Sequence, residues 1–204
     1  GKTPSEILNI SVADIACGSG IFLEEAFAYL QDYCVQWYIC NGQTDHLIET
    51  GIDLYKLPLQ EKKDILCSCI YGIDIDIHAV EVAKFSLLIK LIEDETAPSV
   101  SEVVPILPDL GDNIQFGNSL VSQTELNGIS GANRQMMEIA PFDWSTINNG
   151  CGFDVIIGNP PYVNTEGMHA LLPSAEVEVY KKKYKTSHKQ FLSLIHISEP
   201  TRHS

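Results

Sequence analysis

The segment FDVIIGNPPYV, residues 153–163, contains residue types that could hold a reactive amine. Proline has no N–H and a fixed backbone angle, so Pro160 and Pro161 form a stiff turn, and the first proline also favours an extended Asn159. Such a turn presents carbonyl oxygens, to which Asn159 adds an amide acceptor and Tyr162 adds a flat ring. Two fixed acceptors beside an aromatic face fit the capture of an exocyclic amine on a base that has flipped out of its stack.

An amine of this kind, such as that of adenine, is a weak nucleophile because its lone pair is shared with the ring. Two acceptors that take both of its hydrogens favour the tetrahedral geometry in which the nitrogen attacks, so positioning and electrostatics suffice without a strong base or a metal ion. The alternative is a turn that only ends a strand, since the apolar run FDVIIG predicts a buried strand. The motifs upstream favour the catalytic interpretation.

A second segment, ADIACGSGIF at residues 13–22, combines an acid at a strand end with a glycine-rich turn and the start of a helix. Gly18 and Gly20 remove side chains, so a ligand can approach the backbone, and the N–H groups of residues 19–22 lie at the positive end of the helix. That end suits a carboxylate, and Asp14 suits an ammonium group on the same ligand. A nucleoside that carries an amino acid is S-adenosylmethionine. The turn departs from G-x-G-x-x-G, which makes a nicotinamide dinucleotide less favoured.

A third segment, YGIDID at residues 71–76, places acids at the end of another predicted strand. An acid at this point of such a fold commonly binds both ribose hydroxyls, which assigns that function to Asp74. For Asp76 two interpretations stay open. It is either a second ligand residue or the N-cap of the helix that starts near His78.

Strands and helices that alternate along the chain must position these segments. Apolar residues at helical spacing predict a long helix over residues 21–40, with Phe22, Ala26, Tyr29, Leu30 and Tyr33 in the pattern. We also predict strands at residues 11–16, 67–76, 113–120 and 153–158, a helix at 78–92, a loop with a short helix at 41–63, and a proline-rich surface connection at 96–112. This alternation predicts an α/β fold with a doubly wound, mostly parallel sheet, whose carboxyl edge gathers the site.

The composition is that of a globular protein in a reducing compartment. Apolar residues make up 45% and charged residues 20%, and the six cysteines include no C-x-x-C pair, which predicts buried thiols and no metal site. Neither a membrane span nor a secretory signal is expected. The net charge of −14, taken alone, argues against nucleic-acid binding. Five of the eleven lysines nevertheless lie at residues 181–189, where a merely solvated helix face is one interpretation.

Together these motifs resemble the N6-adenine DNA methyltransferase family of the N-P-P-Y type, in the subgroup of type IIG restriction–modification and related phage-defence enzymes. The resemblance runs from about Val12 to Phe191 and implies a Rossmann-like, S-adenosylmethionine-dependent methyltransferase core that is incomplete. The family's first motif is usually D-P-A-C-G-S-G, and Ile15 replaces its proline here, a mild departure. The resemblance implies cofactor contacts from Asp14, Ala16, Cys17, Gly18, Ser19, Gly20 and Phe22, and from Asp74 and Ile75 of the second motif.

The segments GNSL and NPPY resemble the third and the catalytic motifs of this family. The third motif implies that Asn118 reaches the adenine ring of the cofactor. The catalytic motif, with Pro161 inside it, implies that Asn159 and the Pro160 carbonyl accept the target amine while Tyr162 stacks on the base. The implied substrate is double-stranded DNA with a flipped adenine, held by a recognition domain outside these 204 residues. A restriction nuclease, fused or separate, is the implied partner, and a prokaryotic cytoplasm is the implied location.

The chain is expected to be an internal fragment, because family members usually have a further N-terminal motif and later strands. Residues 1–191 are expected to hold a partial methyltransferase catalytic domain that is inactive by itself. Residues 192–204, LSLIHISEPTRHS, resemble the translation of a common sequencing adapter and are expected to be non-native. A genuine frayed C-terminus is the alternative.

Three other functions share parts of this pattern. Methyltransferases that modify protein glutamine, and others that modify guanine N2 in RNA, also carry N-P-P-Y, because their acceptors are planar nitrogens as well. The long interval between Gly20 and Asp74 favours the DNA enzyme, since a compact methyltransferase needs only one short helix there. A binding module that has lost catalysis is the third, but it would have no need of an intact N-P-P-Y turn.

Overall fold

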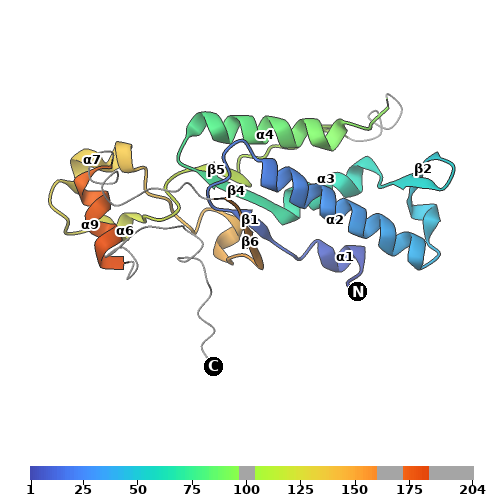
Figure 1. Cartoon of the computed structure of the whole chain (residues 1–204), viewed down its shortest axis with the longest axis horizontal. Helices are drawn as coiled ribbons and strands as arrows, with labels where there is room; N and C mark the ends of the chain where they lie inside the picture. Colours follow the sequence, from blue (N-terminus) through green and yellow to red (C-terminus); the bar gives the residue numbers. More distant parts are fainter. Residues whose placement is uncertain (97–103, 160–171, 184–204) are drawn as a thin grey trace.

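The computed structural model describes residues 1–96, 104–159 and 172–183, and four short parallel strands lie at its centre (Figure 1). They are β1 (Val12–Asp14), β4 (Ile70–Asp74), β5 (Ile114–Phe116) and β6 (Val155–Ile157). Their order in the sheet is β5-β4-β1-β6, so the chain builds outward from β1 to β5 and then returns to the other side of β1. The predicted α/β fold with a doubly wound parallel sheet is confirmed.

The register brings the carboxyl ends of the strands to one edge. Asp14 pairs with Gly72 of β4 on one side and with Ile157 of β6 on the other, and Asp74 pairs with Phe116 of β5. The strand order reverses between β1 and β6, and open α/β sheets bind their ligands beside such a reversal. Each predicted motif therefore follows a strand at the edge where a ligand site is expected.

Helices cover one face of this sheet. They are α2 (Ile21–Cys40), α3 (Leu59–Cys69) and α4 (Ile77–Ile92), with the short α1 (Pro4–Ile7) beside them (Figure 1). The predicted helix over residues 21–40 is confirmed, but its buried stripe is Leu23, Phe27, Leu30 and Cys34. Phe22 and Tyr29, which contributed to the predicted pattern, are 46% and 70% exposed, because the stripe that faces the sheet begins one residue later.

The connection between β5 and β6 covers part of the other face and also forms a second cluster. Phe142 and Ile147 pack on Ala13, Tyr71 and Ile73 of the sheet. Helices α6 (Gln123–Leu126) and α7 (Ala132–Ile139) pack with α9 (Ser174–Lys183) around their own apolar core, which we call the satellite cluster. Figure 1 shows these three helices gathered at one end of the molecule, with β2 at the other end.

Two predicted elements were wrong in detail. The segment 41–63 holds more than a loop and a short helix, because it contains η1 (Thr44–His46), an antiparallel hairpin of β2 (Ile48–Gly51) and β3 (Leu54–Lys56), and the first turn of α3. The second strand begins at Ile70 and not at Cys67, since α3 runs to Cys69. Leu59, Lys62, Ile65, Leu66 and Cys69 are buried at helical spacing, which keeps the two cysteines of CSC in the helix.

Among the described residues, the run FDVIIG forms an edge strand, and the predicted burial is not reached there. Val155 is 43% and Ile156 50% exposed in β6, the last strand of the described sheet. The proline-rich connection at 96–112 lies partly outside the described residues, and its described part from 104 holds no helix or strand. A short η2 (Asn148–Gly150) precedes β6. Within the described ranges, no helix combines the length and apolar character that crossing a membrane requires.

Candidate active site

The turn after β1 folds back over the end of β4 and joins the first two predicted motifs. The N–H of Cys17 donates to the Ile73 carbonyl at 3.0 Å, and the N–H of Gly18 donates to the Asp74 carboxylate at 2.7 Å. The other oxygen of Asp74 accepts from the N–H of Asp76 at 2.9 Å. A carboxylate offers about four acceptor positions, so these bonds orient Asp74 and leave capacity for two hydroxyl donors.

Gly18 and Gly20 differ in what surrounds them. Both have left-handed backbone angles, with φ of +53° and +89°, which favours glycine at each. A Cβ at Gly18 would meet nothing within 4 Å, so space for a ligand lies beside it. A Cβ at Gly20 would come within 3.0 Å of the Ala83 Cβ, so α4 packs directly on this glycine. The ligand-approach interpretation fits Gly18, whereas helix packing explains Gly20.

Asp14 is a buried carboxyl at the centre of the edge. It is 1% exposed and accepts from the N–H of Ala16 at 3.0 Å. Burial raises the pKa of Asp14, the Ala16 N–H lowers it, and the nearby Asp74 raises it again. A cation beside this buried group would relieve the cost of its charge. The site therefore suits an ammonium group next to Asp14.

The other first-motif residues lie around this turn. Cys17 is buried, and this burial, together with the negative charges of Asp74 and Asp14, raises the pKa of its thiol to about 12. Its side chain is therefore a neutral packing group beneath Gly72, and its backbone carries the polar contact. Ser19 is exposed, and Phe22 lies exposed in the first turn of α2.

Ile75 and Asp76, which follow Asp74, differ in their surroundings. Ile75 is 49% exposed at the carboxyl edge, which makes its apolar side chain available to a ligand. Asp76 is the N-cap of α4, because its carboxylate accepts from the N–H of His78 at 2.9 Å. The capping interpretation of Asp76 is thus confirmed.

Asn159 follows β6 at the same edge and is exposed. The residue before it, Gly158, lies against Asp14, and a Cβ there would sit 2.5 Å from the Asp14 Oδ1. The segment predicted to be catalytic therefore begins in contact with Asp14 of the first motif. Pro160, Pro161 and Tyr162 lie outside the described residues, as do residues 184–191 of the lysine-rich segment and the tail at 192–204.

Asn118 follows β5, but its side-chain bonds run to α9 and to Leu120. Its Nδ2 donates to the Glu176 carboxylate at 2.7 Å, and its Oδ1 accepts from the N–H of Leu120 at 3.1 Å. The neighbouring Ser119 reaches the cofactor turn, because its hydroxyl donates to the Ile15 carbonyl at 2.8 Å. The contact of Asn118 with a cofactor adenine stays a prediction.

Sequence reasoning missed Gly158, Ser119 and Glu176. Gly158 and Ser119 sit inside or beside the quoted motifs, yet their contacts join segments far apart in the chain. Glu176 carried a local signal, because it shares one helical face with the apolar Val179 and with Tyr180. An acid on the buried face of a helix indicates a specific polar partner.

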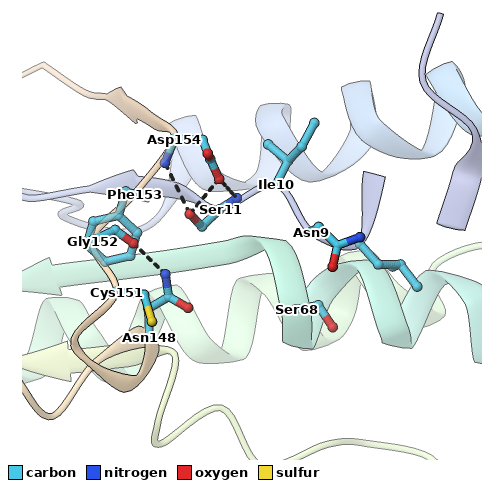
Figure 2. A pocket seen from close by; sticks show the side chains of 10 residues that line it. Asn9, Ile10, Ser11, Ser68, Asn148, Cys151, Gly152, Phe153 and Asp154 are labelled. Carbon is cyan, nitrogen blue, oxygen red and sulfur yellow. Dashed lines mark hydrogen bonds between the residues drawn. The ribbon is translucent and has the colours of Figure 1, made fainter. Parts of the chain in front are cut away.

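A cavity of about 410 Å³ lies at the other edge of the sheet, where the strands begin. Figure 2 shows Ser11, Ser68, Asn148 and Asp154 around it. Asp154 accepts from the N–H of Ser11 at 2.8 Å and from its hydroxyl at 3.0 Å, which fastens the start of β6 to the start of β1. This cavity is separate from the predicted site. In the part of the chain that the structure describes, no cluster of three metal-ligating side chains occurs.

Comparison with known proteins supports the methyltransferase fold. The family model described as "Eco57I restriction-modification methylase" matches residues 68–197. The chain is 46% identical over 191 residues to the type II restriction enzyme and methyltransferase RM.Eco57I of Escherichia coli, covering 94% of this chain and 18% of that protein. It is 34% identical over 122 residues, 60% of this chain and 9% of the relative, to the putative type II restriction enzyme and methyltransferase RM.MjaORFECS2P of Methanocaldococcus jannaschii.

The reversed parallel sheet, with an acid and a glycine turn after β1 and a second acid after β4, is a Rossmann-like methyltransferase fold. The chain belongs to the Eco57I restriction-modification methylase family. It spans less than a fifth of the length of the two curated relatives that it matches.

Proposed function

We propose that the protein containing this chain transfers a methyl group from S-adenosylmethionine to the N6 amine of adenine in DNA, as part of a restriction–modification or phage-defence system. The observation that carries the proposal is the meeting of three motifs at one sheet edge. Gly18 donates to Asp74, and Gly158, next to Asn159, touches Asp14. The two relatives described above are named as a restriction enzyme and methyltransferase and as a putative one, which supports DNA over protein or RNA as substrate.

The proposed cofactor site lies between the first two motifs. Asp14 would hold the ammonium group, and the backbone from Ala16 to Gly20, with the first turn of α2 at Phe22, would hold the carboxylate. Asp74 would bind the ribose hydroxyls, with Ile75 and Asn118 on the adenine side. The open space beside Gly18 and the buried acid at Asp14 fit such a ligand. When bound, S-adenosylmethionine supplies a methyl group already activated by the positive sulfur, so no metal ion is needed.

The proposed catalytic residues hold the acceptor and do not ionise it. Asn159 and the Pro160 carbonyl would accept the two hydrogens of the amine, with Pro161 stiffening the turn, and Tyr162 would stack on the flipped adenine. The amine nitrogen would form the new bond to the methyl carbon as the methyl–sulfur bond breaks and its electron pair stays on sulfur, which leaves a neutral thioether, and the nitrogen would then lose one proton to water. Positioning by fixed acceptors is the source of rate enhancement in this scheme.

We propose that the basic surface for double-stranded DNA belongs largely to other parts of the full-length protein. Of the lysines at the end of α9, Lys182 pairs with Glu178 at 2.6 Å and Lys183 with Glu125 at 2.7 Å. Such pairing supports the interpretation of this cluster as a solvated helix face. The nuclease partner, fused or separate, and the cytoplasm of a prokaryote as location belong to the same proposal.

The test uses the full-length protein with isotope-labelled S-adenosylmethionine and, in parallel, duplex DNA, structured RNA and a glutamine-containing release factor. Mass spectrometry of the digested products identifies the methylated group. We expect N6-methyladenine in DNA, with unchanged transfer in the presence of a chelator. Label in protein glutamine or in RNA guanine would contradict the proposal, as would cofactor binding without any transfer.

A further inference from the structure

A buried polar cluster links α9 to the turn after β5. Glu176 is 2% and Asn118 5% exposed, and the two side chains meet at 2.7 Å. The same oxygen of Glu176 accepts from the Tyr180 hydroxyl at 2.6 Å, and that hydroxyl lies 3.4 Å from the Asn118 Nδ2. Three polar side chains from two distant segments therefore share one site inside the molecule.

Burying these polar side chains costs free energy that apolar side chains at the same positions would not cost. It adjoins the apolar satellite cluster of Val121, Leu126, Ile129, Ala132, Ile139, Ala175 and Val179. Burial raises the pKa of Glu176, the bonds from Tyr180 and Asn118 lower it, and the nearby Glu138 raises it again. Apolar side chains would fill such a position more easily, whereas a fully bonded polar group fixes one relative position of the elements.

The turn that Glu176 holds also touches the proposed cofactor site. The Asn118 N–H donates to the Ala140 carbonyl at 2.7 Å, so this turn is fixed on both sides. The next residue, Ser119, donates to the carbonyl of Ile15, which lies between Asp14 and Ala16. One uninterrupted series of contacts therefore runs from α9 to the turn that holds Asp14.

The orientation of the Asn118 amide follows from the same contacts. The Leu120 N–H can only donate, so the Oδ1 must face it, and the Nδ2 group then faces the Glu176 oxygen that accepts from it. A reversed amide would set N–H against N–H at Leu120. Glu176 and the Leu120 N–H thus together fix which end of the amide points toward the turn.

We propose that Glu176 is a positioning residue for cofactor binding, which acts by orienting Asn118 and so fixing the turn of residues 117–120 against the backbone at Ile15. This inference rests on the proposed function and adds a residue from α9, a helix that follows the catalytic motif in the chain. Tyr180 assists, because its hydroxyl shares the same carboxylate oxygen.

The experiment measures the S-adenosylmethionine Kd of the full-length protein by calorimetry, with thermal unfolding of every variant. We expect Glu176→Ala to raise the Kd about tenfold or more, because it removes the shorter of the two hydrogen bonds that the buried Asn118 amide donates. Glu176→Gln keeps the accepting oxygen and should stay within about twofold of wild type. Glu178→Ala removes an acid on the exposed side of the same helix, which pairs with Lys182, and should leave the Kd unchanged.

A double-mutant cycle separates positioning from general destabilisation. Glu176→Ala and Asn118→Ala should be strongly non-additive in Kd, since each removes the same contact. Where Glu176→Ala fails to fold, Tyr180→Phe replaces it and should raise the Kd a few-fold. An unchanged Kd in the folded variant, additivity in the cycle, or a Gln variant as weak as the Ala variant would overturn the inference. Absence of cofactor binding by the wild type would instead overturn the proposed function.

Discussion

Strands β4 and β6 both carry a motif to the same edge of the sheet, but they are supported very differently. All of β4 up to Ile73 is buried, between β1 and β5. In β6, Val155 and Ile156 are about half exposed, and β1 is the one described strand that pairs with it. Among the described residues, the proposed cofactor half of the site is thus supported by strands on both sides of β4, whereas the proposed catalytic half is held through β1 and the contact of Gly158 with Asp14.

This difference indicates that the two halves fail differently when disturbed. Damage near β4 should change cofactor affinity, since Asp74 and Gly18 form one bonded unit. Damage near β6 should change the transfer step with little effect on the cofactor. The following predictions for the proposed methyltransferase test that separation, and each refers to the full-length protein.

The largest effect is expected for Asn159→Ala. This change removes one of two acceptors for the target amine, whose bond strengthens as the nitrogen becomes tetrahedral, so single-turnover transfer should slow on the order of 10²-fold or more. The cofactor Kd should stay unchanged. Tyr162→Phe is the matched control, because it keeps the stacking face and should be mild. A weaker cofactor Kd with an intact transfer step would mean that the turn is only structural.

Asp74→Ala should give the opposite pattern. The change removes the ribose acceptor and the partner of the Gly18 N–H, so the cofactor Kd should rise about 10- to 100-fold. At saturating cofactor the transfer rate should recover most of its wild-type value. Titration calorimetry and single-turnover kinetics on the same variant measure the two quantities. An unchanged Kd would contradict the assignment of Asp74.

Gly158→Ala tests the point where the halves touch. Its Cβ would lie 2.5 Å from the Asp14 Oδ1, so Asp14 must move, and cofactor affinity should fall about tenfold with a loss of about 1–3 kcal/mol in stability. Gly128→Ala is the control, because Gly128 also has a left-handed φ but open space around it. It should share the backbone strain and keep the cofactor affinity. Equal cofactor affinity in the two variants would show that the contact of Gly158 with Asp14 has no part in cofactor binding.

The smallest effect concerns the pH dependence of stability without cofactor. The folded pKa of Asp14 is raised above 3.8, so the folded state holds its proton in a window where the unfolded chain has lost it. Stability should therefore fall as pH rises through that window and then level off. Asp14→Asn has no charge to bury, and its stability should fall less over the same range. Denaturant unfolding at a series of pH values measures both, and parallel curves would contradict the burial effect.

The sequence predicted helices whose periodicity and capping residues are local. It did not predict features that depend on where a strand lies in the sheet. The helices around residues 21–40 and 78–92 were predicted because periodicity and a capping acid are local signals. The edge position of β6 among the described strands was not predicted, since an apolar run reports hydrophobicity and not which strands pair with it. The motifs indicated Asp14, Gly18 and Asp74 through residue type and spacing. The partner of Asn118 is an acid 58 residues further along the chain, and no local pattern links the two.

The bonds between Ser11 and Asp154 have a consequence for synthesis of the chain. These partners are 143 residues apart, so β1 leaves the ribosome long before β6 exists. At typical translation speeds of about 5–20 residues per second, roughly 7 to 29 seconds pass between the two strands. During that interval β1 can pair with β4 on one side only. Because β1 is only three residues long, its unpaired edge exposes few backbone N–H and C=O groups. Few groups are therefore available to pair wrongly with a neighbouring nascent chain.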